Sequence, residues 1–202
     1  MNRWLFVVLA LAPLAARAEA VSDLLMAPGV FAEAPVGSAV AYAEERTVPD
    51  GGSLVDVAAG AVRLEVHEDG GKRELRLVKE SAGQAQPVGT FPPGVANPLL
   101  LYFLETTVRA TAEATGGSPY YIRNRIREAL VAADATGEGA EREAVLVPFA
   151  GDPNRAKMGA FADLTLRLRF DPERPERILE LSADTAPGEA GYHEKMVLIA
   201  ED

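Results

Sequence analysis

The sequence contains no cysteine and only two histidines among its 202 residues. Without cysteine there can be no disulfide, thiol nucleophile or thiolate metal ligand, so the fold must rely on an ordinary hydrophobic core. His67 and His193 lie far apart in the sequence and lack metal-ligand spacing. A structural role is therefore favoured for both over a general base or a metal ligand, and we expect neither a metal nor a cofactor.

Catalytic motifs are also missing. No serine lies in a nucleophile-elbow pattern or a Ser-x-x-Lys pair. The glycine pair 116–117 precedes a helix start and could hold an anion, but no phosphate-loop lysine follows, and a helix C-cap explains it better. Residues 152–154 lack the glycine of a calcium loop and are interpreted as a turn. An enzyme is therefore the least favoured class of function.

Positive charge is scarce: 20 Lys and Arg stand against 30 Asp and Glu, a net charge of −10. Proteins bind nucleic acid mainly by neutralising its phosphates, which an acidic chain does poorly. Nucleic acid is thus excluded as the expected partner, and binding to anionic lipid headgroups is disfavoured for the same reason.

No apolar run is long enough to span a bilayer, but a shorter one lies at the N-terminus. Arg3 precedes the uncharged segment 4–14, and small residues at 16 and 18 follow it. This pattern is typical of a cleavable secretory signal over residues 1–18. We expect cleavage before Glu19 and a soluble periplasmic domain, residues 19–202, with 18 basic against 30 acidic side chains.

Strand-like alternation occurs on both sides of the chain's middle. Apolar residues alternate with charged ones over 62–67 and 74–77, separated by a Gly-Gly turn, which predicts a hairpin with a charged outer face. The strictest alternation covers residues 163–170. Further strands are expected at 177–183 and 192–200, and weaker ones at 40–48 and 54–57. Residues 83–98 hold four prolines and are interpreted as an irregular connection, and 134–143 as an acidic loop.

A helical hairpin is predicted over about residues 98–133. Asn97-Pro98 supplies an N-cap and a first-turn proline, and no breaker interrupts residues 99–115 before the Gly-Gly pair. Ser118-Pro119 repeats the start signal, and apolar residues three and four apart follow over 121–133.

Strands, a helical hairpin and strands again define an α+β fold: a single domain with a curved antiparallel sheet of six to nine strands, half-barrel-like, packed on the hairpin. The order of elements is similar in outline to that of exported lipoprotein carriers, a likeness of architecture without a shared residue motif. It implies a site for an apolar or amphipathic ligand between sheet and helices.

One constellation on the hairpin suits such a ligand. Glu105 and Arg109 are four residues apart on the first helix, and Arg123 and Arg127 share a face of the second helix with Tyr120. If the two faces meet, these five residues form a polar cluster able to receive a carboxylate or phosphate. A solvated helix face with stabilising ion pairs is the alternative.

The function expected from these features is that of an exported, non-enzymatic binding or carrier protein for a lipid or another amphipathic small molecule. The alternative is a structural or interaction module of the cell envelope, which uses its acidic surface to meet a basic protein partner and has no small-molecule ligand.

Overall fold

The computed structural model describes residues 20–81, 83–137, 139–185 and 191–201, so the expected signal segment lies outside the described residues. One antiparallel sheet of nine strands runs through the molecule in the order β4-β3-β2-β1-β9-β8-β7-β6-β5. Its first half contains β1 (Ala39–Thr47), β2 (Val57–Asp69), β3 (Lys72–Ser81) and β4 (Gln84–Phe91). The second half contains β5 (Ala135–Thr136), β6 (Arg142–Leu146), β7 (Thr165–Asp171), β8 (Arg174–Asp184) and β9 (His193–Glu201).

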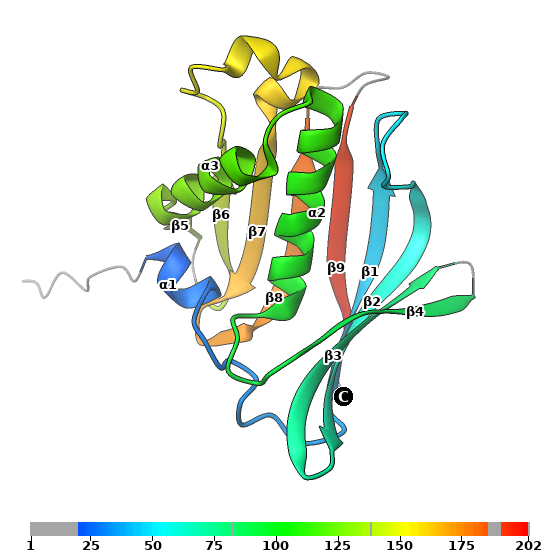
Figure 1. The fold of residues 1–202 in the computed structure, drawn as a ribbon. Coiled ribbons are helices and arrows are strands. Elements are labelled where there is room, and N and C mark those ends of the chain that lie inside the picture. The colour runs from blue at the N-terminus through cyan, green and yellow to red at the C-terminus, as the bar shows by residue number, and fades with distance from the viewer. Residues whose placement is uncertain (1–19, 82, 138, 186–190, 202) are drawn as a thin grey trace, which may run out of the picture.

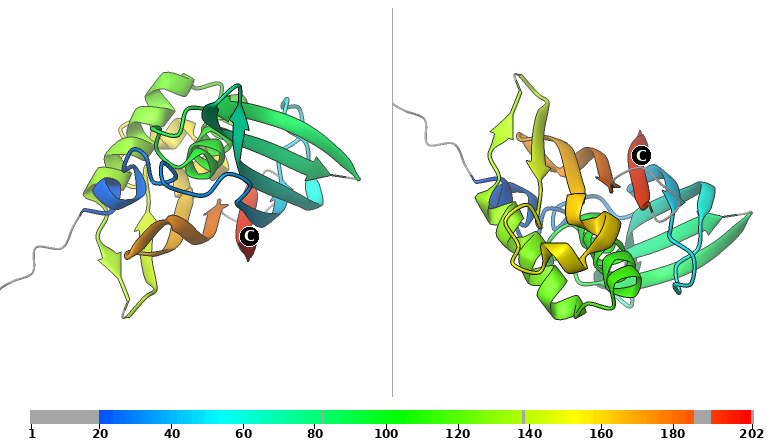
Figure 2. Two further views of the ribbon diagram at one scale, coloured as in Figure 1. Left: turned by 90° about the horizontal axis from the view of Figure 1, so that it is seen from below. Right: turned by 90° about the horizontal axis from the view of Figure 1, so that it is seen from above.

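The helices lie on one face of this sheet. Helices α2 (Pro98–Thr115) and α3 (Pro119–Ala132) form the hairpin, and the short α1 (Val21–Leu25) contacts α3. Figure 1 shows α2 running lengthwise along the sheet, and in Figure 2 the sheet bends so that β2–β4 curve towards the helix side. The predicted α+β architecture is confirmed: the sheet is open, the helix pair packs on it, and the chain is a single domain.

The two clearest alternations in the sequence form strands in the predicted orientation. In the β2–β3 hairpin, Glu65 pairs with Arg76 and His67 with Glu74 on the outer face. On β7, Leu166 and Leu168 are fully buried, whereas Arg167 is exposed. Because successive side chains of a strand point to opposite faces, one register fixes both the core and the charged surface.

The helix boundaries agree with the predicted caps. The Asn97 side chain accepts a hydrogen bond from the Leu99 amide over 3.0 Å, and Gly116 ends α2 with a left-handed φ of 67°. A residue with a Cβ is strained in that conformation, so glycine is required there. Ser118 precedes α3 but makes no side-chain capping bond, so Pro119 provides the start signal.

The interpretation of residues 83–98 as an irregular connection is wrong in its first half, where β4 forms. Because β4 is the last strand of the sheet, one of its edges needs no partner, and Pro87 can pair with Val78 without breaking a second ladder.

Three further segments differ from the sequence interpretation. The acidic segment 134–143 holds β5 and the beginning of β6, which pair over only two residue positions. Residues 54–56 stay outside the sheet, and β2 begins at Val57. The third segment follows the turn expected at 152–154, which residues 153–154 form, and contains two short 3₁₀ turns that were not predicted, η1 (Arg155–Lys157) and η2 (Gly159–Asp163).

A single hydrophobic core lies between the sheet and the helices. Leu99, Leu100 and Phe103 of α2 are completely buried against strands such as β2, β3 and β8. The space directly under the first two turns of α2 is therefore filled with side chains. Among the described residues, no helix combines the length and the apolar character needed to cross a membrane.

Candidate functional site

A cleft opens beside α2, where the bent outer strands β3 and β4 rise next to the helix. It has a volume of about 670 Å³. Its apolar walls come from both sides, namely from Leu77, Pro87, Val88 and Phe91 on the strands and from Leu101 on α2. A concave site of this size that combines apolar walls with several polar groups is typical of small-molecule binding.

Cations gather at this cleft, although the whole chain is acidic. Lys79 reaches it from β3, Arg109 from α2 and Arg123 from α3, and Glu105 is the only acidic residue among those that line it. Within the described chain, no salt bridge joins Lys79 or Arg109 to a carboxylate, although the Arg109 charge helps to lower the pKa of Glu113, one turn further along α2. Both can therefore meet an incoming anion without first breaking a salt bridge.

A buried charge cluster adjoins the cleft between β1, β9 and α2. The Arg46 guanidinium lies 3.2 Å from a Glu44 carboxylate oxygen and 3.3 Å from one of Glu194. All three residues are almost inaccessible, with exposed fractions of 4% for Arg46, 3% for Glu44 and 0% for Glu194. Such a group is stable only when its charges are compensated and its hydrogen bonds are made.

Two tyrosines complete these hydrogen bonds. Tyr102 of α2 donates to Glu44 over 3.0 Å, and Tyr192 donates to the second oxygen of Glu194. Burial raises the pKa of Glu194 to about 8, although the Tyr192 hydrogen bond and the Arg46 charge act in the opposite direction. Burial and the Glu44 charge raise the pKa of Tyr102 to about 12. The raised pKa favours the protonated form of Glu194, which reduces the negative charge that is buried beside Arg46.

Only the Arg46 and Tyr102 members of this cluster line the cleft. The carboxylates of Glu44 and Glu194 lie behind them, and a bound molecule would meet a guanidinium and a phenol and not an acid–base pair. The Arg46 guanidinium is already engaged with both glutamates, so it contributes positive potential to the wall of the cleft and not a free anion-binding group.

The five residues expected from the sequence to form a site are only partly brought together. Arg123 binds Glu105 in a two-pronged ion pair with contacts of 2.8 and 3.1 Å, and both side chains are about half exposed. Arg109 lines the cleft with them. Arg127 lines a separate groove between the helices, and Tyr120 is 72% exposed and lines neither.

The remaining functional candidates were not found from the sequence, although a signal for some of them was present. Tyr42, Glu44 and Arg46 alternate along β1, and Tyr42 is fully buried. Charged residues on the apolar face of a strand indicate a buried polar cluster. The pairing of β1 with β9, which places Glu194 opposite Arg46, could not be predicted from the local pattern. Lys79 was likewise missed, because it looks like the charged end of a hairpin strand.

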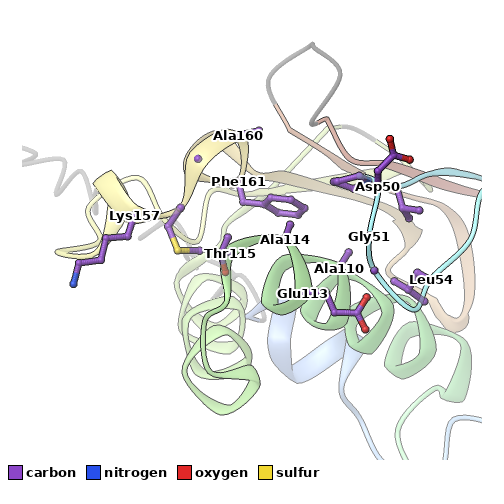
Figure 3. A pocket seen from close by; sticks show the side chains of 15 residues that line it. Asp50, Gly51, Leu54, Ala110, Glu113, Ala114, Thr115, Lys157, Ala160 and Phe161 are labelled. Carbon is purple, nitrogen blue, oxygen red and sulfur yellow. The ribbon is translucent and has the colours of Figure 1, made fainter.

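A second hollow lies at the other end of α2 and is less suited to a charged ligand. It has a volume of about 520 Å³ between the 48–54 loop, α2 and the 3₁₀ turns. Figure 3 shows Phe161, Ala110 and Ala114 around it and Lys157 pointing away. The Glu113 carboxylate accepts hydrogen bonds from the Ser53 amide, over 2.8 Å, and from the Ser53 hydroxyl. Glu113 thus fixes the loop that walls this hollow.

The 152–154 segment has a structural role. The buried Asp152 carboxylate accepts hydrogen bonds from Tyr121, at 2.8 and 2.7 Å, and from the Asn154 amide, and lies 2.8 Å from Arg125. Burial acts to raise the pKa of Asp152, but these donors and the arginine charge keep it below its usual value. The network fastens α3 to the loop before β7. Within the described residues, no three potential ligands are grouped so as to hold a metal.

Comparisons with models of known protein families and with curated proteins found no match to this chain. The fold and the cleft are therefore the basis for a functional proposal.

Proposed function

We propose that this protein is an exported, non-enzymatic binding or carrier protein for an anionic amphipathic ligand, and that the cleft beside α2 receives the charged end of that ligand. The observation that carries the proposal is the gathering of Lys79, Arg109 and Arg123 over an apolar wall in an otherwise acidic molecule. A few convergent polar groups in an apolar cleft are typical of ligand sites, and a guanidinium suits carboxylate or phosphate.

The proposal is tested by calorimetric titration of the chain starting at Glu19 with hexyl phosphate and, as a matched cation, hexyltrimethylammonium. The phosphate should bind and the cation should not. A Lys79→Gln, Arg109→Gln double variant should lose at least tenfold in phosphate affinity, because two charge-assisted contacts disappear. Arg167→Gln is the control, since this exposed arginine lies on the opposite face of the sheet. Equal loss in the control, or equal binding of both probes, contradicts the proposal.

The packed core favours a second candidate, an interaction module of the cell envelope. The complete burial of Leu99, Leu100 and Phe103 leaves no space for a ligand under the first two turns of α2. Native mass spectrometry of the protein purified from its own host separates the two functions. A carrier should retain a bound amphipath, whereas an interaction module should be recovered without one.

A further inference from the structure

An apolar groove lies on the other side of α2, between α1, α2 and α3. It has a volume of about 640 Å³, and its lining is mostly apolar. The apolar members include Met26, which directly follows α1, Leu104 and Val108 of α2, and Ile126, Leu130 and Val131 of α3. Its polar members are Ser22, Asp23, Glu105, Arg123 and Arg127. Val131 is 61% exposed, so part of this apolar lining is open to solvent.

The groove and the cationic cleft meet at a shared border. Leu101, Glu105 and Arg123 line both of them. Leu101 and Glu105 are one helical turn apart on α2, so their side chains form a ridge between the two hollows. Arg123 reaches across from α3 to this ridge and is held there by its ion pair with Glu105.

We infer that the groove and the cleft form one composite site, in which the alkyl chain of an anionic amphipath lies in the groove and its anionic group lies at the ridge and in the cleft. This inference rests on the proposed function and specifies its ligand as a single-chain anionic amphipath. The chain would cover Leu104, Val108 and Leu130, and the anion would meet Arg123 and Arg109.

The charges of the cleft, where Lys79, Arg109 and Arg123 outnumber Glu105, favour this occupant over a neutral chain or a basic peptide. In the groove itself, Asp23 and Glu105 balance Arg123 and Arg127. Arg127 flanks the groove and forms no ion pair with a described carboxylate, and Arg123 stands at the groove's border with the cleft. The anionic group of a ligand can replace the Glu105 carboxylate as the partner of the Arg123 guanidinium. The exchange costs little, because both side chains are about half exposed and the released carboxylate is solvated.

The test is a calorimetric series of alkyl phosphates from hexyl to dodecyl, each kept below its micelle-forming concentration. If the chain enters the groove, affinity should increase by about two- to fourfold for each added methylene, the upper value corresponding to full burial. Val131→Asp places a carboxylate in the groove at an exposed position and should flatten this increase while hexyl phosphate binding persists. Leu104→Ser should flatten it as well.

Val145→Asp is the matched control, because Val145 is also exposed but lies on the outer face of β6. It should leave the chain-length dependence unchanged. Affinity that does not depend on chain length in the wild type, or a dependence that Val131→Asp leaves intact, overturns the composite site. A dimer in the ligand-free protein that Val131→Asp dissociates also overturns it, since the groove would then join two copies of the chain.

These outcomes separate the inference from the proposed function. If hexyl phosphate binds and needs Lys79 and Arg109, but longer chains bind no better, the cationic cleft stands and the composite site fails. If no alkyl phosphate binds, both fail.

Discussion

At the scale of single residues, the buried Glu44–Arg46–Glu194 cluster determines the charge beneath the cleft. One guanidinium contacts two carboxyl groups, so the cluster avoids a net negative charge only when one of them carries a proton. The raised pKa of Glu194 assigns that proton to the member that is completely inaccessible. With that proton bound, Arg46 offsets the charge of Glu44, so the cluster adds no net negative charge that would repel an anion in the cleft.

Substitution of Glu194 by glutamine should change how stability depends on pH. Burial raises the pKa of Glu194 from 4.5 to about 8, so between these values the native state holds a proton that the unfolded chain has lost. The stabilisation that this proton provides is complete below pH 4.5. As the pH rises from 4.5 towards 8, the free energy of unfolding falls by up to about 1.4 kcal/mol per pH unit. Glu194→Gln should remove this loss in urea melts at several pH values. Glu65→Gln, at an exposed ion pair, should retain it.

Two neighbouring arginines of α3 should differ sharply in their effect on stability. Arg123 and its partner Glu105 are about half exposed, so Arg123→Ala should change the free energy of unfolding by no more than about 0.5 kcal/mol. Arg125 contacts an Asp152 side chain with no exposed surface. Arg125→Ala should cost about 1–3 kcal/mol, because that carboxylate loses its compensating charge. Denaturant titration of both variants measures the difference, and equal costs would contradict the assigned burial.

The candidate site could be predicted in part from sequence. Helix periodicity and the short connection 116–118 suffice to bring Arg123 near Glu105, because two helices joined by three residues lie side by side. The contacts of Glu194 with Arg46 depend on which strands become neighbours across 148 residues, and local patterns carry no such information. Lys79 joins the site only because the sheet bends towards α2.

At the scale of elements, β7 is where the pattern and the structure agree best. Leu166 is fully buried, whereas Thr165 is only partly buried on the other face of the strand. Leu166→Ala should therefore destabilise the protein by about 2–5 kcal/mol, as removal of buried methyl groups does, and Thr165→Ala by well under half of that. Thermal and denaturant melts test the pair. Similar costs at both positions would mean that the strand register is wrong.

Long, periodic elements were predictable, and short or edge elements were not. The helices carry caps and a 3.6-residue repeat, and β2, β3 and β7 carry a two-residue repeat, all of which are local signals. Strand β4 contains Pro87, which argues against a central strand but is tolerated at an edge. Strand β5 has two residues and no repeat to detect; it exists because β6 lies beside it.

At the scale of the whole molecule, the proposed export signal defines the chain that we expect to fold. The apolar segment 4–14 and the small residues before position 19 predict that the mature protein begins at Glu19. N-terminal sequencing or intact-mass measurement of protein from the periplasmic fraction tests this. A retained Met1, or protein that stays with membranes after a salt wash, would contradict it.

The continuous sheet predicts how the whole molecule should respond to its ligand. Since one nine-stranded sheet and one core join both halves, the protein should unfold in a single transition. Binding at the cleft should then stabilise the entire molecule and not only the strands beside it. At a free dodecyl phosphate concentration of about 100 times the Kd, stability should rise by about 2.7 kcal/mol. For a domain of this size, that corresponds to a Tm increase of about 5–10 °C.

Differential scanning calorimetry with and without the ligand measures this shift. The Lys79→Gln, Arg109→Gln variant should show a much smaller one at the same ligand concentration. Two separate transitions, with only the one containing β2–β4 shifted by ligand, would mean that the bent part of the sheet folds independently of the rest.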